Sequence, residues 1–408
     1  MAAPNPADIN IASPAHKADP FPFYARLRAE SPAFAVKLAD GQTAWLVSRY
    51  DDAVTVLKDD VHFIKDKLNA LTPQQQRKQP WLPPMFRPLA RNMLDVDSPD
   101  HPRLRMLVQK AFAPRIVERV RPRIESLAGE LLDSCHRRGR IDLVRDYALP
   151  LPTTVIAEML GIPSGDRKKF HRWSGAIVTS NPTGFGMLKA IPSIWSFLRY
   201  IRRLVRLKRQ QPADDLLTAL VQAEEAGAKL NEDELVAMVF LLLVAGHETT
   251  VSLIGNGMLA LLRQPDQWQR LRDDPSIVVS AVEELLRFAG PLETATERYA
   301  QEGAAVAGVS IPRGDVVFAA LASANRDERQ FPSPQRLDLG RDPNRHLAFG
   351  MGPHFCLGAA LARMEAQIAI RLLASQAPGL QLDCDPTQVK WRRGLVLRGV
   401  AALPMKIR

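Results

Sequence analysis

A cysteine between a glycine turn and a predicted helix is the side chain of this sequence best suited to bind a metal. Cys356 follows Gly350 and Gly352, which permit a tight turn because they carry no side chain, and it precedes a helical segment, 359–365. At a helix start, unpaired backbone N–H groups and the positive end of the helix dipole favour a thiolate over a thiol. Gly358 leaves room for a flat group against the helix. A thiolate directed at a flat face is what a haem iron with a cysteine ligand requires, although a single cysteine is more often a buried structural residue.

The most apolar helix that the sequence predicts begins with a capping signal. Asn231 and Glu234 are spaced as a capping box, and the apolar periodicity that follows runs to Gln264, just before Pro265. At 1.5 Å per residue this helix is roughly 50 Å long, which is enough to cross a whole domain.

Small and polar residues interrupt one face of that helix. Ala245 and Gly246 make room for a small ligand, and Glu248 and Thr249 follow them. The Thr249 hydroxyl can bend the helix by hydrogen bonding to a carbonyl one turn back, so a kink in a buried helix is the alternative interpretation. His247 is interpreted as a supporting or packing residue.

Two further pairs are spaced to share one face of a helix. Glu284 and Arg287 are three residues apart and can form a local ion pair, although most such pairs are solvated. His101 and Arg105 are four residues apart. Either pair alone would more often be a surface feature than part of a site.

The ten residues 349–358 match every fixed position of the signature F-G-x-G-x-H-x-C-x-G, and the sequence therefore resembles the cytochrome P450 family. Further family motifs occur in the same order along the chain. They are the H-x-x-x-R helix at 101–105, the oxygen-groove motif at 244–250, the E-x-x-R motif at 284–287, the strand arginine Arg298 and the later arginine element at 334–336. The resemblance covers about residues 95–408, whereas the first ninety residues match only in general layout.

The resemblance implies a haem b cofactor, iron protoporphyrin IX, with Cys356 as the ligand of its iron. It places three residues against the cofactor, namely Phe349, Gly350 and Ala245. It assigns the haem propionates to four side chains, which are His101, Arg105, Arg298 and His354. It makes Glu284 and Arg287 a buried structural pair, with Arg336 holding the loop that presents the cysteine.

The activity implied is that of a haem-thiolate monooxygenase, which inserts one oxygen atom of dioxygen into a C–H bond. In the family, Glu248 and Thr249 would deliver the protons. A peroxide-driven oxidant of the same fold would not need these two residues. A non-catalytic haem-binding sensor would normally carry an effector domain, and the sequence gives no sign of one. Both remain alternatives.

Electrons must come from separate proteins, because the sequence carries no flavin or iron–sulfur motif. Cys135, Cys356 and Cys384 form no cluster, and the glycines at 184–186 do not make a dinucleotide fingerprint. We expect an acidic ferredoxin and its reductase as partners. The basic residues suited to dock the ferredoxin are Arg103, Lys110, Arg115 and Arg119.

The elements that must position these residues predict a mainly α fold with a small β lobe, and the resemblance makes this the cytochrome P450 fold with its long helix over the haem. Segments 34–36 and 44–47 flank Asp40-Gly41 as a hairpin, and 306–311 and 316–320 are predicted strands. Helical periodicity dominates from about 98 to 287, while the irregular composition of 324–352 indicates a functional loop. We expect one domain, 1–408, in which residues up to about 95 include the β-rich lobe and a variable substrate-access loop.

Composition limits the classes of partner. The chain has 408 residues and a net charge of 54 − 44 = +10, but no run of five basic residues and no interleaved aromatics, which disfavours nucleic acid. Residues 1–20 lack the apolar core of a signal peptide, and the longest apolar run, 235–245, is about half of what a bilayer requires. Three scattered cysteines suit a reducing compartment. We expect a soluble, cytoplasmic monomer without a membrane segment.

Apolar residues dominate the segments expected to line the substrate site. These segments are 81–86, 177–194, 241–245, 292–296 and 395–397. They predict a hydrophobic small-molecule substrate of terpenoid, steroid, fatty acyl or macrolide-like character. The same pattern also describes an ordinary protein core.

Overall fold

The apolar segment predicted as a long helix forms α13 (Glu232–Leu262), the longest helix among the residues that the computed structural model describes. These residues are 10–38, 41–77, 91–109, 112, 114–167, 169, 173, 185–223 and 230–407. The backbone N–H of Glu234 donates to Oδ1 of Asn231 at 2.8 Å, and that of Asn231 donates to Oε2 of Glu234 at 2.9 Å. The capping box is therefore confirmed. By length and composition α13 could cross a membrane, but 67% of its most apolar window is buried inside the protein, as in a core helix.

The chain divides into two compact units. The first unit comprises residues 1–78, 125–149 and 249–408, and the second comprises 79–124 and 150–248. Helices α8 (Pro114–Arg138) and α13 contribute residues to both. The single domain spanning 1–408 remains a prediction. Lys110, the predicted substrate-lining segment 81–86 and the first part, 177–184, of the segment 177–194 lie outside the described residues.

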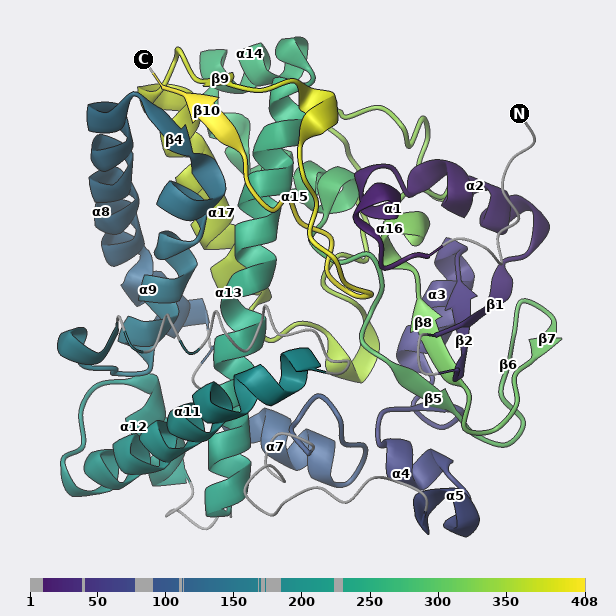
Figure 1. The fold of residues 1–408 in the computed structure, drawn as a ribbon. Coiled ribbons are helices and arrows are strands. Elements are labelled where there is room, and N and C mark those ends of the chain that lie inside the picture. Colours follow the sequence, from purple (N-terminus) through teal and green to yellow (C-terminus); the bar gives the residue numbers. More distant parts are fainter. Residues whose placement is uncertain are drawn as a thin grey trace. The chain divides into compact units, whose positions relative to one another are not determined.

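The first unit contains a five-stranded sheet in the order β1-β2-β8-β5-β3 (Figure 1). Strands β1 (Ala33–Lys37) and β2 (Thr43–Val47) are antiparallel, which confirms the predicted hairpin. Strand β8 (Val316–Ala319) runs parallel to β2 and antiparallel to β5 (Arg298–Ala300), which pairs with β3 (Phe63–Ile64). All four residues of β8 are buried, as expected of a central strand covered on both faces.

The predicted strand at 306–311 is wrong. The segment folds back on itself as two short antiparallel strands, β6 (Ala305–Val306) and β7 (Val309–Ser310). Ala307 and Gly308 form the turn with φ values of 52° and 75°. Because positive φ at both central positions produces a tight hairpin turn, the apolar run is divided after Val306.

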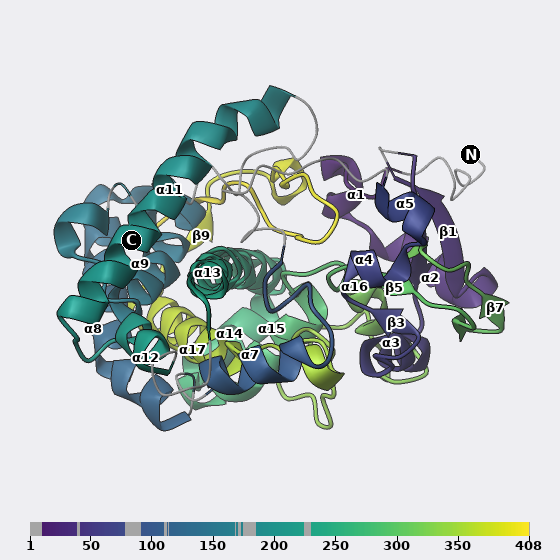
Figure 2. The same cartoon turned by 90° about the horizontal axis from the view of Figure 1, so that it is seen from below.

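The first unit also contains helices on both sides of α13 in the sequence. Those in its N-terminal part are α1 (Pro14–Ala18), α2 (Phe21–Glu30), α3 (Tyr50–Lys58), α4 (Lys67–Ala70) and α5 (Pro73–Arg77). Those after α13 are α14 (Pro265–Asp273), α15 (Val278–Ala289), α16 (Leu321–Ala324) and α17 (Ala359–Gln376). Helix α17 packs against α14 and α15, and Figure 2, which looks along α13, shows these three helices close together. A second sheet pairs β10 (Pro404–Lys406) with β4 (Arg140–Asp142) and β9 (Gln381–Leu382).

The described part of the second unit is helical. It contains α7 (Asp100–Gln109), α9 (Pro150–Met159), α11 (Phe185–Gln210) and α12 (Leu216–Ala223) together with the first half of α13. Arg103 of α7 contacts Glu234 at 2.5 Å, and Arg202 of α11 contacts Asp233 at 3.0 Å, so two helices are tied to the start of α13. The two units together confirm a mainly α fold with a small β lobe.

Candidate functional site

Backbone hydrogen bonds hold the cysteine loop in a defined conformation. The N–H of Cys356 donates to the carbonyl of Phe349 at 2.9 Å, and the N–H of Gly350 donates to that of Leu347 at 2.8 Å. Gly350 and Gly352 have φ values of 69° and 74°, the left-handed region that glycine adopts most readily. The predicted glycine turn is therefore confirmed, and Cys356 lies just before α17, whose N-cap is Gly358.

The end of α3 closes on this loop. A Cβ atom on Gly352 would lie 2.5 Å from the carbonyl oxygen of Leu57, so only glycine fits at this position. The same oxygen accepts a hydrogen bond from Arg298 Nη2 at 3.0 Å, while Nη1 of Arg298 donates to the carbonyl of Phe63 at 3.0 Å. Arg298 and the cysteine loop therefore meet the same turn of backbone.

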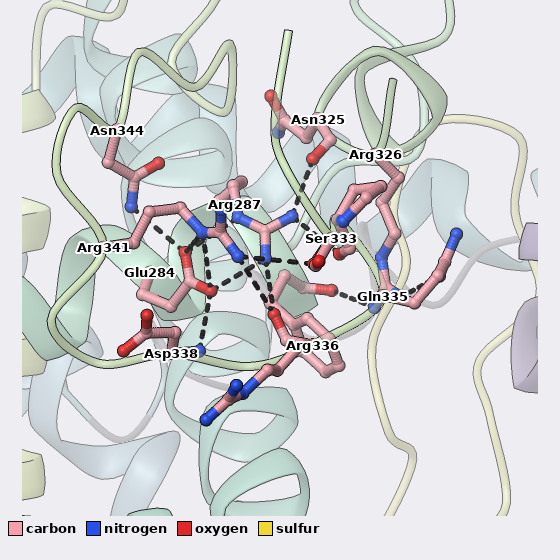
Figure 3. Close-up of polar contacts among 12 residues, drawn as sticks. Glu284, Arg287, Asn325, Arg326, Ser333, Gln335, Arg336, Asp338, Arg341 and Asn344 are labelled. Atoms are coloured by element: carbon pink, nitrogen blue, oxygen red, sulfur yellow. Dashed lines mark hydrogen bonds and ion pairs between the residues drawn. The ribbon is translucent and has the colours of Figure 1, made fainter. Parts of the chain in front are cut away.

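The E-x-x-R pair is fully buried at the centre of a network that secures the irregular segment before the cysteine (Figure 3). Arg287 donates to both carboxylate oxygens of Glu284 at 2.7 Å. Its Nη atoms also donate to three backbone carbonyls, which belong to Asn325, Pro334 and Arg336. One side chain thus fixes the path of the segment at three points.

The third arginine of this network is not the one that the sequence indicated. Arg336 contributes only its carbonyl to the contacts of Arg287, and its side chain is exposed. The guanidinium that contacts Glu284 belongs to Arg341, whose Nε lies 3.2 Å from both carboxylate oxygens (Figure 3). The assignment of Arg336 is corrected to Arg341, because the chain turns between the two residues and directs the later side chain inward.

A second ionic cluster beside the cysteine loop was missed by the sequence analysis. Glu283 accepts hydrogen bonds from Arg363 of α17 at 2.7 and 2.9 Å and from Nε2 of His346 at 3.1 Å. Burial alone would raise the pKa of Glu283, but these hydrogen bonds and the charge of Arg363 lower it to about 2. Arg363 also lies over the ring of Phe349, 4.4 Å from its centroid. The sequence motifs did not indicate this cluster, because Glu283 is 63 residues from His346 and 80 residues from Arg363.

The middle of α13 presents a stripe of accessible residues. Ala245 is exposed, and Leu241 and Thr249, one turn to either side, are half-buried. A Cβ atom on Gly246 would meet only Ile156, at 3.8 Å, so packing within the second unit does not require glycine there. The small residues of the motif therefore leave one face of a core helix open.

Two buried polar residues adjoin this stripe. His247 contacts the carbonyl of Leu243 through Nδ1 at 2.6 Å, and since a carbonyl can only accept, Nδ1 carries the proton. Its Nε2 lies 3.4 Å from Oε1 of Glu248. His247 is thus held by backbone next to Glu248, in agreement with the supporting position expected of it.

The remaining predicted cofactor residues are distributed over both units. His101 is buried and Arg105 half-buried on α7 of the second unit, whereas Arg298 is buried in β5 and His354 half-buried in the cysteine loop of the first. Within the described ranges, no group of three or more His, Cys, Asp or Glu side chains is arranged to hold a metal ion. Cys356 of the glycine-turn loop therefore remains the candidate metal ligand among the residues described.

Comparison with known proteins identifies the family. The cytochrome P450 family model matches residues 187–375. The chain is 44% identical to cytochrome P450 monooxygenase PikC of Streptomyces venezuelae, and the alignment covers 100% of this chain and 95% of that protein. The chain belongs to the cytochrome P450 family. This cytochrome P450 is also 41% identical to the vitamin D(3) 25-hydroxylase of Pseudonocardia autotrophica, over 95% of this chain and 93% of the relative.

A solved structure shows the same fold. The myxobacterial cytochrome P450 CYP267B1, in complex with myristic acid, superposes with a TM-score of 0.91 at 43% identity and covers 98% of both chains. The predicted cytochrome P450 fold, the monooxygenase class and the haem b cofactor are thereby confirmed.

The residues around Cys356 fit this cofactor. A Cβ atom placed on Gly358 would meet no atom within 4 Å, and its φ of −84° is open to any residue, so neither packing nor backbone requires a glycine there. A flat ring system bound against this face would account for the glycine. The half-buried thiol of Cys356 lies two residues earlier on the same turn.

Burial gives one carboxyl of this P450 an unusual pKa. Glu365 on α17 is fully buried, and desolvation raises its pKa from 4.5 to about 8. Between pH 4.5 and 8 the folded state holds a proton that the unfolded state has lost, so the free energy of unfolding falls as the pH rises, by up to about 1.4 kcal/mol per pH unit.

We expect Glu365→Gln to remove this dependence, as measured by urea unfolding at pH 5, 6.5 and 8. Exposed Glu302→Gln is the matched control, and a variant slope equal to that of the wild type would contradict the raised pKa.

Proposed function

We propose that this cytochrome P450 inserts one oxygen atom of dioxygen into a C–H bond of a hydrophobic small molecule, with electrons from a separate acidic ferredoxin and its reductase. Two observations carry this proposal, namely the cysteine after the glycine turn and the open stripe of α13 that ends in Thr249, with buried Glu248 next to it in the chain. The substrate class is terpenoid, steroid, fatty acyl or macrolide-like. In support, the half-buried side chains of Leu292 and of 395–397 are apolar.

We assign the following roles in cofactor binding to individual residues. Cys356 holds the haem iron, and Phe349, Gly350 and Ala245 pack against the ring. The propionates are bound by His101, Arg105, Arg298 and His354. When bound, haem supplies the iron at which dioxygen is reductively activated. The protein acts as a monomer and a single domain in the cytoplasm.

Proton delivery falls to Glu248 and Thr249. The buried carboxyl of Glu248 can exchange protons, and His247 beside it restricts its conformation. The Thr249 hydroxyl, half-buried on the open stripe, can pass a proton toward a ligand there. A peroxide-driven enzyme would not need this pair, and a haem sensor would not turn over substrate.

The test is a screen followed by turnover. Hydrophobic compounds of the four classes are added to the haem-loaded protein, and binding is read from the shift in spin state of the iron. NADPH consumption and product formation are then measured with a surrogate ferredoxin system and, separately, with hydrogen peroxide. Product only with peroxide would favour the peroxide-driven alternative, and binding without any product would favour the sensor.

Gly358 provides a prediction on the cofactor contact. Because the structure has room for a side chain there, Gly358→Ala leaves the stability of the haem-free protein unchanged within about 0.5 kcal/mol. The added methyl group would instead stand against the haem ring. We therefore expect a lower affinity for haem, measured by haem titration alongside chemical unfolding of the apoprotein. Unchanged haem affinity would place the ring elsewhere.

Two of the basic residues proposed to dock the ferredoxin are favoured by their exposure. Arg103 is engaged by Asp100 and Glu234, whereas Arg115 and Arg119 at the start of α8 are exposed. We expect Arg115→Glu/Arg119→Glu to slow reduction by an acidic ferredoxin about tenfold at low ionic strength, because electrostatic steering is reversed. Stopped-flow reduction measures this effect. The double variant Arg203→Glu/Arg206→Glu, exposed on α11, changes net charge equally, and an equal slowing would exclude a specific surface.

A further inference from the structure

A buried carboxylate in the first unit gathers three side chains from the N-terminal segment. Oε1 of Glu293 accepts hydrogen bonds from Nε2 of His16 at 2.8 Å and from the hydroxyl of Tyr24 at 2.7 Å, and Oε2 accepts one from Nζ of Lys17 at 2.6 Å. Lys17, Tyr24 and Glu293 are completely buried. Burial alone would raise the pKa of Glu293, but the His16 hydrogen bond and the Lys17 charge lower it, so the carboxylate is ionised and all three partners donate. We name these four residues the Glu293 cluster.

The Glu293 cluster is also tied to the segment 394–398. The N–H of Glu293 donates to the carbonyl of Val396 at 2.8 Å, and Lys17 Nζ donates to that of Leu395 at 3.2 Å. Arg398 returns to the N-terminal segment, because its Nε donates to the carbonyl of Lys17 at 2.9 Å. Three stretches that are far apart in sequence therefore share one set of hydrogen bonds.

The residues next to the cluster have a different character. Leu292 forms an isolated antiparallel bridge with Leu397, so the residue before Glu293 lies beside the segment 394–398. The carboxylate of Glu293 contacts the N-terminal residues His16, Lys17 and Tyr24. Leu292 and Leu395 to Leu397 are half-buried and apolar. Under the proposed function, these are the walls of the substrate site.

A polar cluster is a costly way to hold two loops if packing is its only purpose. Burying Lys17 and Glu293 requires that both be desolvated, and apolar residues of similar volume would often stabilise a fold as well. Hydrogen bonds are directional, so the carboxylate accepts its donors in one geometry. They therefore favour a single arrangement of the segments that carry these donors. The Glu293 cluster is thus suited to fixing the positions of the apolar side chains beside it.

We propose that Glu293 is a positioning residue for substrate selectivity. It holds the N-terminal segment 16–24 and the segment 394–398 in one fixed position relative to each other, and this fixes the position of the apolar side chains that line the substrate site. This inference rests on the proposed function, since it takes the two segments to line the substrate site. It assigns a selectivity role to His16, Lys17 and Tyr24 although none of them belongs to a family motif.

Tyr24→Phe tests the proposal with the smallest change, because it removes one hydrogen bond and leaves the ion pair intact. Tyr147→Phe is the matched control, since the hydroxyl of Tyr147 is equally buried in the first unit but donates to the carbonyl of Ala369. Myristic acid and progesterone serve as probes of two shapes, and imidazole, which binds at the haem iron, reports on an intact haem site.

We expect Tyr24→Phe to change the ratio of the two Kd values by about fivefold or more, with the imidazole Kd and the carbon monoxide spectrum unchanged. Tyr147→Phe should leave the ratio at its wild-type value. Glu293→Gln and His16→Gln are expected to shift the ratio in the same sense, and either alone suffices if the other does not fold. Wild-type ratios in Tyr24→Phe and His16→Gln would overturn the proposal, whereas wild-type protein that binds neither probe and no other compound of the screen would overturn the proposed function first.

Discussion

Replacing Cys356 by serine is expected to abolish the red-shifted Soret band of the reduced carbon monoxide complex and to reduce substrate oxidation by more than about 100-fold, since even groups that only support a metal ligand contribute 10- to 100-fold. The backbone of the loop should survive the change, because the hydrogen bond from residue 356 to the carbonyl of Phe349 involves only the main chain. The loss would therefore report on the sulfur atom itself.

No other cysteine can take over the role. Cys135 is buried on α8, and desolvation raises the pKa of its thiol to about 11. The pKa of Cys384 is raised as well, first by burial and then by the charges of Asp383 and Asp385 on either side. Both thiols therefore resist ionisation, and a thiolate is the form that binds iron.

Cys384→Ser is the matched control, because it removes a half-buried thiol outside the loop and should keep the spectrum and the rate of the wild type. The measurements are the carbon monoxide difference spectrum and product formation per haem. A Cys356→Ser protein with the thiolate band intact would contradict the assignment of the iron ligand.

Local signals in the sequence predicted the elements around the site well. The capping box of Asn231 and Glu234, the hairpin of β1 and β2, and the glycine turn before Cys356 each depend on residues within a few positions of one another. The strand at 306–311 failed for an equally local reason, because Gly308 offered a turn that the apolar pattern concealed. Local structure can be predicted from the sequence where local interactions determine the backbone conformation more strongly than tertiary contacts do.

Contacts between distant residues could not be predicted in the same way. Lys17 and Glu293 are 276 residues apart, and Glu283 and Arg363 are 80 apart, so no spacing rule relates them. In the sequence these residues cannot be distinguished from charged surface residues. Only the folded structure shows that they are removed from solvent and paired. A buried charge without an adjacent partner in sequence can be recognised only once the chain has brought its counter-charge into place.

Arg341 and Arg336 offer the sharpest test of such a distant contact. We expect Arg341→Ala to lower the free energy of unfolding by about 2 to 3 kcal/mol, because Glu284 loses one of its charged donors while it remains buried. Arg336→Ala should change it by less than about 0.5 kcal/mol, because the side chain is exposed and the carbonyl that Arg287 uses is retained.

The loss in Arg341→Ala should extend to the cofactor. Arg341 also donates to the carbonyl of Pro332 at 2.9 Å, so its removal loosens the segment that leads to Cys356, and haem should dissociate faster. Haem transfer to an apoglobin acceptor and urea unfolding measure the two effects. Arg341→Lys keeps the charge but not the forked geometry and should recover only part of the stability. If Arg336→Ala proved the more damaging substitution, the exposed arginine would be the true partner of Glu284, and the loop would have to follow a different path to the cysteine.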